Sequence, residues 1–235
     1  MLPSKTTLLS AAYVGLSAAD SVVAGRGPGA RRARLVLKPT LMPVLTAAFV
    51  SATRGPDRRA GTRLLRTGTV AAQALSWGGD VALLGSGKRP FLAGLGSFLG
   101  AHVAYLAAFG SVRGEHREHD VAGVEVALGA WLVLAPGMAA AAGRQDHALR
   151  GPVAAYATVI TAMPAASRVL DPALPREARR RVRAGTALFL LSDTVLGLQR
   201  FALRDPHPVV GSVVMSTYTA GQGLIAAGVA GATRG

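Results

Sequence analysis

The stretch 76–109, SWGGDVALLGSGKRPFLAGLGSFLGAHVAYLAAF, consists of two apolar runs joined by a short turn of Gly, Ser, Lys, Arg and Pro at 85–90. Each run carries one ionisable residue, Asp80 in the first and His102 in the second. If the runs are antiparallel membrane helices, a charged group at the bilayer centre costs about 2.5–3.5 kcal/mol, which makes such a residue a candidate for function. The stretch therefore indicates chemistry inside a membrane.

The composition of the whole chain favours the same class. Half of its 235 residues are hydrophobic and only 16% are charged, which is too little polar surface for a soluble domain of this size. Eight apolar runs of 18–24 residues each match about 30 Å of hydrocarbon. They cover 6–24, 35–52, 65–84, 91–110, 121–142, 152–170, 184–203 and 209–232. We therefore predict an all-α, polytopic integral membrane protein with a single domain, residues 1–235, that is a bundle of eight transmembrane helices.

The basic residues indicate how this bundle sits in the membrane. Lys and Arg outnumber Asp and Glu by 26 to 12, and they cluster between the apolar runs. This pattern favours loops beside anionic lipid headgroups and argues against a nucleic-acid partner. Loops on the side of the N-terminus carry more of the basic residues, so we predict a multi-pass protein of the cell membrane with both termini in the cytoplasm. The first run lacks a basic leader and a cleavage site, and we expect it to be retained as a helix.

Polar residues inside the runs gather in one half of the predicted bilayer. Seven of the eight helices contribute to this half, which predicts a cavity that opens toward the non-cytoplasmic leaflet. The residues in question are Asp20, Lys38, Asp80, His102, Tyr156, Asp193, Tyr218 and Gln222.

Several catalytic signatures can be tested against this set. The serine-hydrolase motif G-x-S-x-G is absent. His102 is the only histidine within a run, whereas a catalytic zinc needs three protein ligands. The chain has no cysteine, which excludes thiolate chemistry. The cluster Glu115, His116, Glu118, His119 and Asp120 has metal-ligating residue types, but we interpret it as a solvated turn in which Asp120 caps the next helix. We predict neither a metal nor another cofactor.

Two carboxylates remain, Asp80 and Asp193. Two acids that face one cavity of low dielectric cannot easily both ionise, so one would keep its proton and suit acid-catalysed hydrolysis. The alternative is that each acid pairs with a buried cation, for example Asp20 with Lys38, and fixes helices together. In the same way, four residues are candidates either for substrate contacts or for hydrogen bonds between helices. These are Tyr105, Tyr156, Tyr218 and Gln222.

Five strings in order along the chain resemble the YhhN family, the bacterial branch of the transmembrane lysoplasmalogenases. They are KPTLMP at Lys38, SWGGDVALL at Asp80, FLAGLGSFLGAHVAYLAAF around His102, GTALFLLSDTVLGLQRF at Asp193 and MSTYTAGQGLIAAG at Tyr218. The resemblance implies a membrane enzyme that cleaves the vinyl ether bond of lysoplasmalogens, giving a fatty aldehyde and glycerophosphoethanolamine or glycerophosphocholine. Its two proposed catalytic aspartates match Asp80 and Asp193.

On this interpretation, the partners are a lysophospholipid substrate and the surrounding lipid. Asp80 and Asp193 would share the acid and base roles, and His102 would orient water or one carboxylate. Lys38 and Arg200 would hold the phosphate, while Asp20 would join the substrate-binding set. Two alternatives stay open, a non-catalytic lysolipid-binding or transport protein and an intramembrane aspartyl protease, although the Tyr-Asp and Gly-x-Gly-Asp signatures of the latter are absent. The oligomeric state is also open.

Overall fold

The computed structural model describes residues 3–55, 62–115 and 120–234, and these residues form an all-helical bundle. Its only β-type pairing in the described ranges is a single bridge between Arg113 and Leu170. The α-helices of these described residues are α1 (Lys5–Ala24), α2 (Arg31–Ala52), α3 (Thr62–Ala82), α4 (Lys88–Gly110), α5 (Val121–Gln145), α6 (Arg150–Arg168), α7 (Arg176–Phe201) and α8 (Val209–Arg234). The short 3-10 helices η1 (Gly27–Ala30) and η3 (His147–Leu149) lie in the connections.

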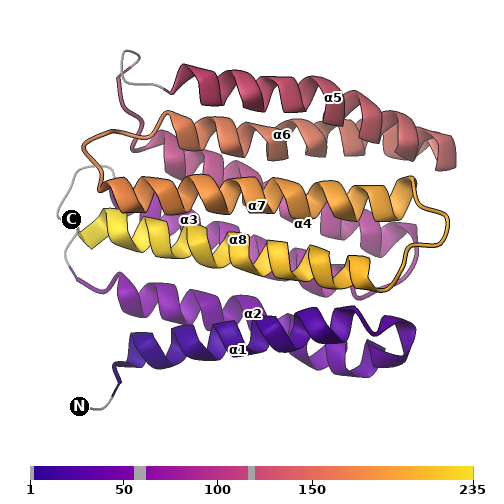
Figure 1. Cartoon of the computed structure of the whole chain (residues 1–235), viewed down its shortest axis with the longest axis horizontal. Helices are drawn as coiled ribbons and strands as arrows, with labels where there is room; N and C mark the ends of the chain where they lie inside the picture. Colours follow the sequence, from indigo (N-terminus) through magenta and orange to yellow (C-terminus); the bar gives the residue numbers. More distant parts are fainter. Residues whose placement is uncertain (1–2, 56–61, 116–119, 235) are drawn as a thin grey trace.

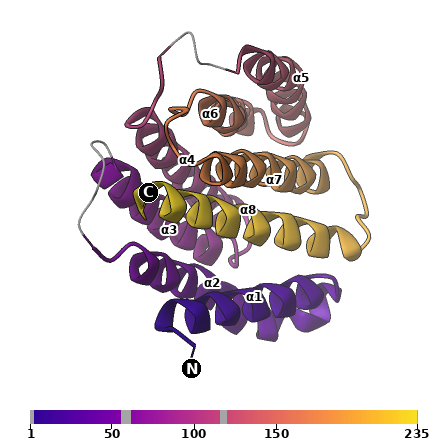
Figure 2. The ribbon, with the colours of Figure 1, turned by 60° about the vertical axis from the view of Figure 1, so that its left-hand side comes forward.

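Helices that follow one another in the chain pack as antiparallel pairs. The pairs are α1 with α2, α3 with α4, α5 with α6, and α7 with α8. Figures 1 and 2 show α7 and α8 lying over α3 and α4, with α1 and α2 on one side and α5 and α6 on the other. Helix α8 also packs against α1, α2 and α3, and α4 packs against α6. Both termini lie at the same end of the bundle (Figure 1).

Helices α2 and α7 begin furthest ahead of the apolar runs that predict them. Helix α2 begins at Arg31, four residues before the run at 35–52, and α7 begins at Arg176, eight residues before the run at 184–203. Arginine is a good helix former, so a helix continues through it after hydrophobicity has ended. The Gly-Pro-Gly segment before α2 and Pro175 before α7 mark the true starts.

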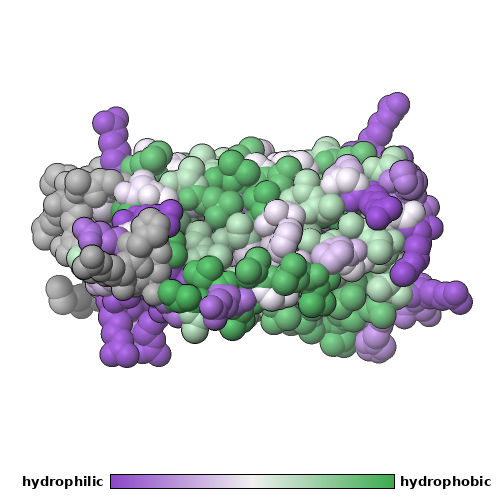
Figure 3. Space-filling model, turned by 90° about the horizontal axis from the view of Figure 1, so that it is seen from above, coloured by the Kyte–Doolittle hydropathy of each residue, from purple (hydrophilic) through white to green (hydrophobic). Residues whose placement is uncertain are grey.

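Five of the helices are long and apolar enough to cross a membrane, namely α1, α2, α4, α5 and α8. Helix α3 falls short because its buried face is polar and includes Thr69, Gln73, Ser76 and Asp80. Helix α7 falls short because its first turns are rich in arginine. Figure 3 shows hydrophobic side chains over the middle of the elongated molecule and hydrophilic ones at its ends. The chain therefore has the character of a membrane protein, while crossing by all eight helices stays a prediction.

Two internal details of the helices position the site. Pro43 lacks an N–H, which leaves the carbonyl of Pro39 without its helical donor, and the indole nitrogen of Trp77 donates to that carbonyl at 2.9 Å. This contact fixes α3 against α2. Between α7 and α8, a Cβ atom added to Gly185 would lie 2.7 Å from the carbonyl oxygen of Gly221. The absence of side chains there lets the two backbones approach closely.

Candidate functional site

The first polar cluster joins Asp193 on α7, Tyr156 on α6 and His102 on α4. The Tyr156 hydroxyl donates a hydrogen bond to Oδ2 of Asp193 and lies 3.0 Å from Nε2 of His102. The same Nε2 is 3.6 Å from Oδ2 of Asp193. Since the single hydroxyl proton goes to Asp193, the Tyr156 oxygen can accept from His102 only if Nε2 carries a proton. Nδ1 of His102 is buried without a hydrogen-bond partner in the described structure.

The second polar cluster joins Asp80 on α3, Lys38 on α2 and Tyr218 on α8. Nζ of Lys38 lies 3.2 Å from Oδ1 of Asp80, and the Tyr218 hydroxyl donates to Oδ2 of Asp80 at 2.8 Å. The side chain of Asp80 is 1% exposed and that of Lys38 is 9% exposed. The buried carboxyl of Asp80 thus has two partners, a cation from α2 and a hydroxyl donor from α8.

Aromatic rings lie between the two clusters. The ring of Phe189 is edge-on to His102, with centroids 4.8 Å apart, and edge-on to Tyr218, with centroids 5.3 Å apart. Asp80 therefore balances its charge with Lys38, and Asp193 contacts Tyr156 and His102 instead. The expectation that the two acids face one cavity is not met, because Asp80 and Asp193 lie in separate clusters with different partners.

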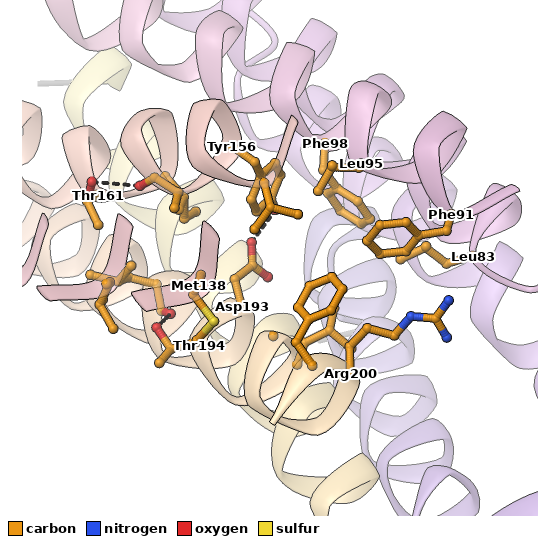
Figure 4. A pocket seen from close by; sticks show the side chains of 18 residues that line it. Leu83, Phe91, Leu95, Phe98, Met138, Tyr156, Thr161, Asp193, Thr194 and Arg200 are labelled. Carbon is orange, nitrogen blue, oxygen red and sulfur yellow. Dashed lines mark hydrogen bonds between the residues drawn. The ribbon is translucent and has the colours of Figure 1, made fainter. Parts of the chain in front are cut away.

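An apolar cavity of about 80 Å³ borders the first cluster. Asp193, which is 11% exposed, and Tyr156 are among its lining residues, and Asp80 is not. Figure 4 shows Asp193 within this cavity, facing Tyr156, with aromatic and aliphatic side chains around it. The volume exceeds the roughly 10–15 Å³ that one water needs. The cavity can thus take a few waters or a short apolar segment beside a carboxylate.

A second cavity of about 620 Å³ is basic and lies at the end of the bundle opposite the termini. The α1–α2, α3–α4 and α7–α8 connections contribute to its wall, as do four cationic side chains. These are Arg31, Arg34, Lys38 and Arg200. The two cavities are neighbours, because Leu83, Phe91, Leu196 and Arg200 line both. An apolar wall with a carboxylate therefore lies beside a basic wall.

The remaining candidates separate into two kinds. Asp20 pairs with Arg34 at 3.6 Å, so the suggested pair with Lys38 is wrong, because Lys38 is engaged by Asp80. Tyr105 donates to Gln222 at 2.6 Å, and Gln222 donates to Ser76 at 2.9 Å. This buried chain links α4, α8 and α3 and lines neither cavity, which favours the alternative of hydrogen bonds between helices.

Sequence reasoning missed Arg31 and Arg34 as cavity residues. The hydrophobic run placed them in a loop, although Arg31, Arg34 and Lys38 have the spacing i, i+3, i+7 of one helix face. Arg200, which was expected at the phosphate, does line the basic cavity and stacks over Phe91, with its Cζ 5.0 Å from the ring centroid.

The turn before α5 agrees with the capping interpretation of Asp120. Its side chain accepts from the backbone N–H of Gly123 at 3.0 Å and from Arg168 at 2.9 Å. The hydrogen bond from Arg168, followed by that from Gly123, lowers the pKa of the Asp120 carboxyl. Three of the metal-ligating types in that cluster, His116, Glu118 and His119, lie outside the described residues.

Comparison with known proteins identifies one family. The family model described as the YhhN family matches residues 33–229, which covers most of the chain and contains both polar clusters. No curated protein and no solved structure matches the chain.

Proposed function

The chain belongs to the YhhN family, and on this premise we propose that it is a membrane-embedded hydrolase of lysoplasmalogen-type lysolipids. It cleaves their vinyl ether bond and releases a fatty aldehyde and the glycerophosphate-containing headgroup. The family is associated with hydrolase activity. The observation that carries the proposal is the position of Asp193, a carboxylate on the wall of an apolar cavity that adjoins a basic one.

The substrate fits this pair of cavities in one direction. Its phosphate occupies the basic cavity near Lys38 and Arg200, at the end of the bundle where headgroups would lie. Arg200 and Asp193 are seven residues apart on α7, which is two turns on one face and about 10 Å along the axis. The vinyl ether, a few bonds from the phosphate, thereby reaches Asp193. The rest of the chain extends from the small apolar cavity toward lipid.

The chemistry needs a proton on carbon. The carboxyl of Asp193 gives its proton to the β-carbon of the vinyl ether, and the double-bond electrons form the new C–H bond. An oxocarbenium ion results, and the Asp193 carboxylate stabilises it. Water adds to the cationic carbon and gives a proton back to the Asp193 carboxylate. The lipid carbon that received the water is then a hemiacetal. The hemiacetal then separates into aldehyde and alcohol. A carboxyl group in an apolar wall suits the first step, because the alkene of the lipid chain can lie against that wall within reach of the carboxyl.

The neighbours of Asp193 take supporting roles in this proposal. Tyr156 holds Oδ2 by a hydrogen bond, which leaves Oδ1 for the substrate, and His102 holds Tyr156. Asp80 is not the second acid here. It anchors Lys38, whose ammonium lines the basic cavity, and thereby keeps a cation at the headgroup.

The test is to incubate purified protein with lysolipids that share a headgroup and a chain length but differ in the linkage. Mass spectrometry should find fatty aldehyde from the alkenyl lipid and no product from the alkyl or acyl lipid. Fatty acid from the acyl lipid would identify a lysophospholipase instead. Recovery of all three lipids unchanged, with the protein still binding them, would favour the alternative of lysolipid binding or transport.

A further inference from the structure

The charges around the basic cavity are unbalanced. Four cationic side chains line it, and two of them have a buried acid behind them. Arg34 lies 3.6 Å from Asp20, and Lys38 lies 3.2 Å from Asp80. Within the described part of the chain, Arg31 and Arg200 have no acidic partner. The cavity wall therefore carries two positive charges in excess.

The same wall has little to offer a headgroup ammonium. No Asp or Glu is among its lining residues in the described ranges, and Phe91 is its aromatic residue. The face of Phe91 is already covered by the guanidinium of Arg200 at 5.0 Å. Choline and ethanolamine groups are held by carboxylates or by open aromatic faces. A zwitterionic headgroup would therefore place its cation among cations.

Arg34 is held in a way that leaves it available to a ligand. Its Nε and both carboxylate oxygens of Asp20 are buried and make no hydrogen bond in the described structure, so their contact is ionic without the two-pronged geometry of a strong pair. Arg31, Arg34 and Lys38 follow one face of α2. Guanidinium donors on such a face match the oxygens of a terminal phosphate.

We infer that the basic cavity selects lysolipids whose headgroup is a simple phosphate monoester over those with phosphocholine or phosphoethanolamine. The inference rests on the proposed function for the orientation of the lipid and adds the identity of the headgroup. A phosphate monoester has a second pKa of about 6 and carries two negative charges at pH 8. These match the two excess positive charges, whereas a zwitterionic headgroup brings no net charge.

Binding is measured with 1-O-alkyl lysolipids, whose saturated ether is not cleaved, in three forms with the same chain: phosphate, phosphocholine and phosphoethanolamine. The protein is held in phosphatidylcholine nanodiscs at pH 8. The phosphate form should bind at least 10-fold more tightly than either other form. Equal affinities would overturn the inference. Glycerol 3-phosphate and inorganic phosphate serve as chainless competitors, and competition by either at the concentration of the lipid would overturn the assignment to a lipid headgroup.

Variants locate the preference. Arg31→Gln should reduce the preference to less than 3-fold, because it removes one of the two cations without an acidic partner and leaves no buried acid unpaired. Arg32→Gln is the matched control, since Arg32 is exposed on the same turn and is not among the cavity residues, and it should keep the preference. A preference that survives Arg31→Gln would contradict the inference.

The two proposals fail separately. A protein that cleaves vinyl ethers but binds all three alkyl lipids equally would leave the hydrolase and overturn the headgroup inference. A protein that prefers the phosphate form but releases no aldehyde from any alkenyl lipid would do the reverse.

Discussion

Substitution of Asp193 is the most direct mutational test of the proposed chemistry. Asp193→Asn keeps the shape of the side chain and a partner for Tyr156, but it cannot deliver a carboxyl proton. We expect aldehyde release to fall by about 10²–10⁴-fold, the usual contribution of general acid catalysis. Turnover is measured on detergent-purified protein by aldehyde trapping. Asp205→Asn, at an exposed acid in the α7–α8 connection, is the control, and a rate near wild type for Asp193→Asn would remove this residue from catalysis.

The Lys38 and Asp80 pair is predicted to act as a unit in stability. Asp80→Asn alone leaves a buried ammonium without its acid and should cost about 3–5 kcal/mol of unfolding free energy. The double variant Lys38→Met with Asp80→Asn should recover most of this loss. Denaturation in detergent measures the cycle.

The exposed pair Lys88 and Asp146 is the control for this cycle, because surface pairs contribute about 0–1 kcal/mol. Additive losses in the Lys38 and Asp80 cycle, with no recovery in the double variant, would show that the two side chains do not depend on each other.

At the scale of single residues, the sequence identified the buried polar side chains but did not predict which of them contact one another. The cost of polar groups in hydrocarbon selected Asp80, Asp193, His102 and Lys38, and the structure places all four in two polar clusters. Pairing could not be predicted, because Asp80 meets Lys38 only through the packing of α2 against α3. We therefore expected Asp80 and Asp193 to repel each other, whereas Asp80 contacts the cation Lys38.

At the scale of helices, the contact between α7 and α8 should tolerate no added methyl group. A Cβ atom on Gly221 would lie 2.9 Å from the carbonyl oxygen of Gly185, and backbone cannot move aside as a side chain can. Gly221→Ala should lower the stability by about 1–3 kcal/mol, the usual cost of overpacking. Thermal unfolding in detergent measures the change.

Gly129→Ala in α5 is the matched control, since a Cβ atom there meets nothing within 4 Å. Alanine at a compatible helical position stabilises by about 0.4–1 kcal/mol, so this variant should be neutral or slightly stabilised. Equal losses in both variants would refute the close approach of α7 and α8.

The extent of each helix was predictable where hydrophobicity and turn residues coincide, as at the start of α8, Val209. It was not predictable from hydrophobicity at α2, because Arg31 and Arg34 are polar yet helical. Because of this error, two of the four cationic side chains of the basic cavity, Arg31 and Arg34, were not predicted. A search for helical spacing among charged residues next to an apolar run would have found it.

At the scale of the whole molecule, the predicted eight membrane crossings would place both termini on one side. The chain has no cysteine, so single cysteines can be introduced without background. We expect Ser4→Cys and Arg234→Cys, at two exposed positions, to react with a membrane-impermeant maleimide from the same side, and Ser86→Cys in the α3–α4 connection from the opposite side. Intact cells and inverted vesicles provide the two measurements. Opposite labelling of the two terminal positions would mean an odd number of crossings.

The arrangement of the molecule followed from composition, since apolar runs of membrane length leave few options other than a helical bundle. The division of its interior into an apolar and a basic cavity could not be predicted from composition, because cavities depend on which helices pack together. Helix α8, for example, contacts four other helices, α1, α2, α3 and α7. The proposed reaction uses both cavities in one orientation of the substrate.

The central claim is that a proton is delivered to an alkene carbon, and one reaction in D2O tests it most directly. The wild-type protein cleaves alkenyl lysolipid in D2O, and the aldehyde is reduced to the alcohol as it forms. Mass spectrometry then measures the deuterium content of this alcohol. Protonation of the β-carbon predicts one deuterium on the carbon next to the former carbonyl, with product lost in Asp193→Asn. Aldehyde that carries no deuterium at that carbon would contradict the mechanism.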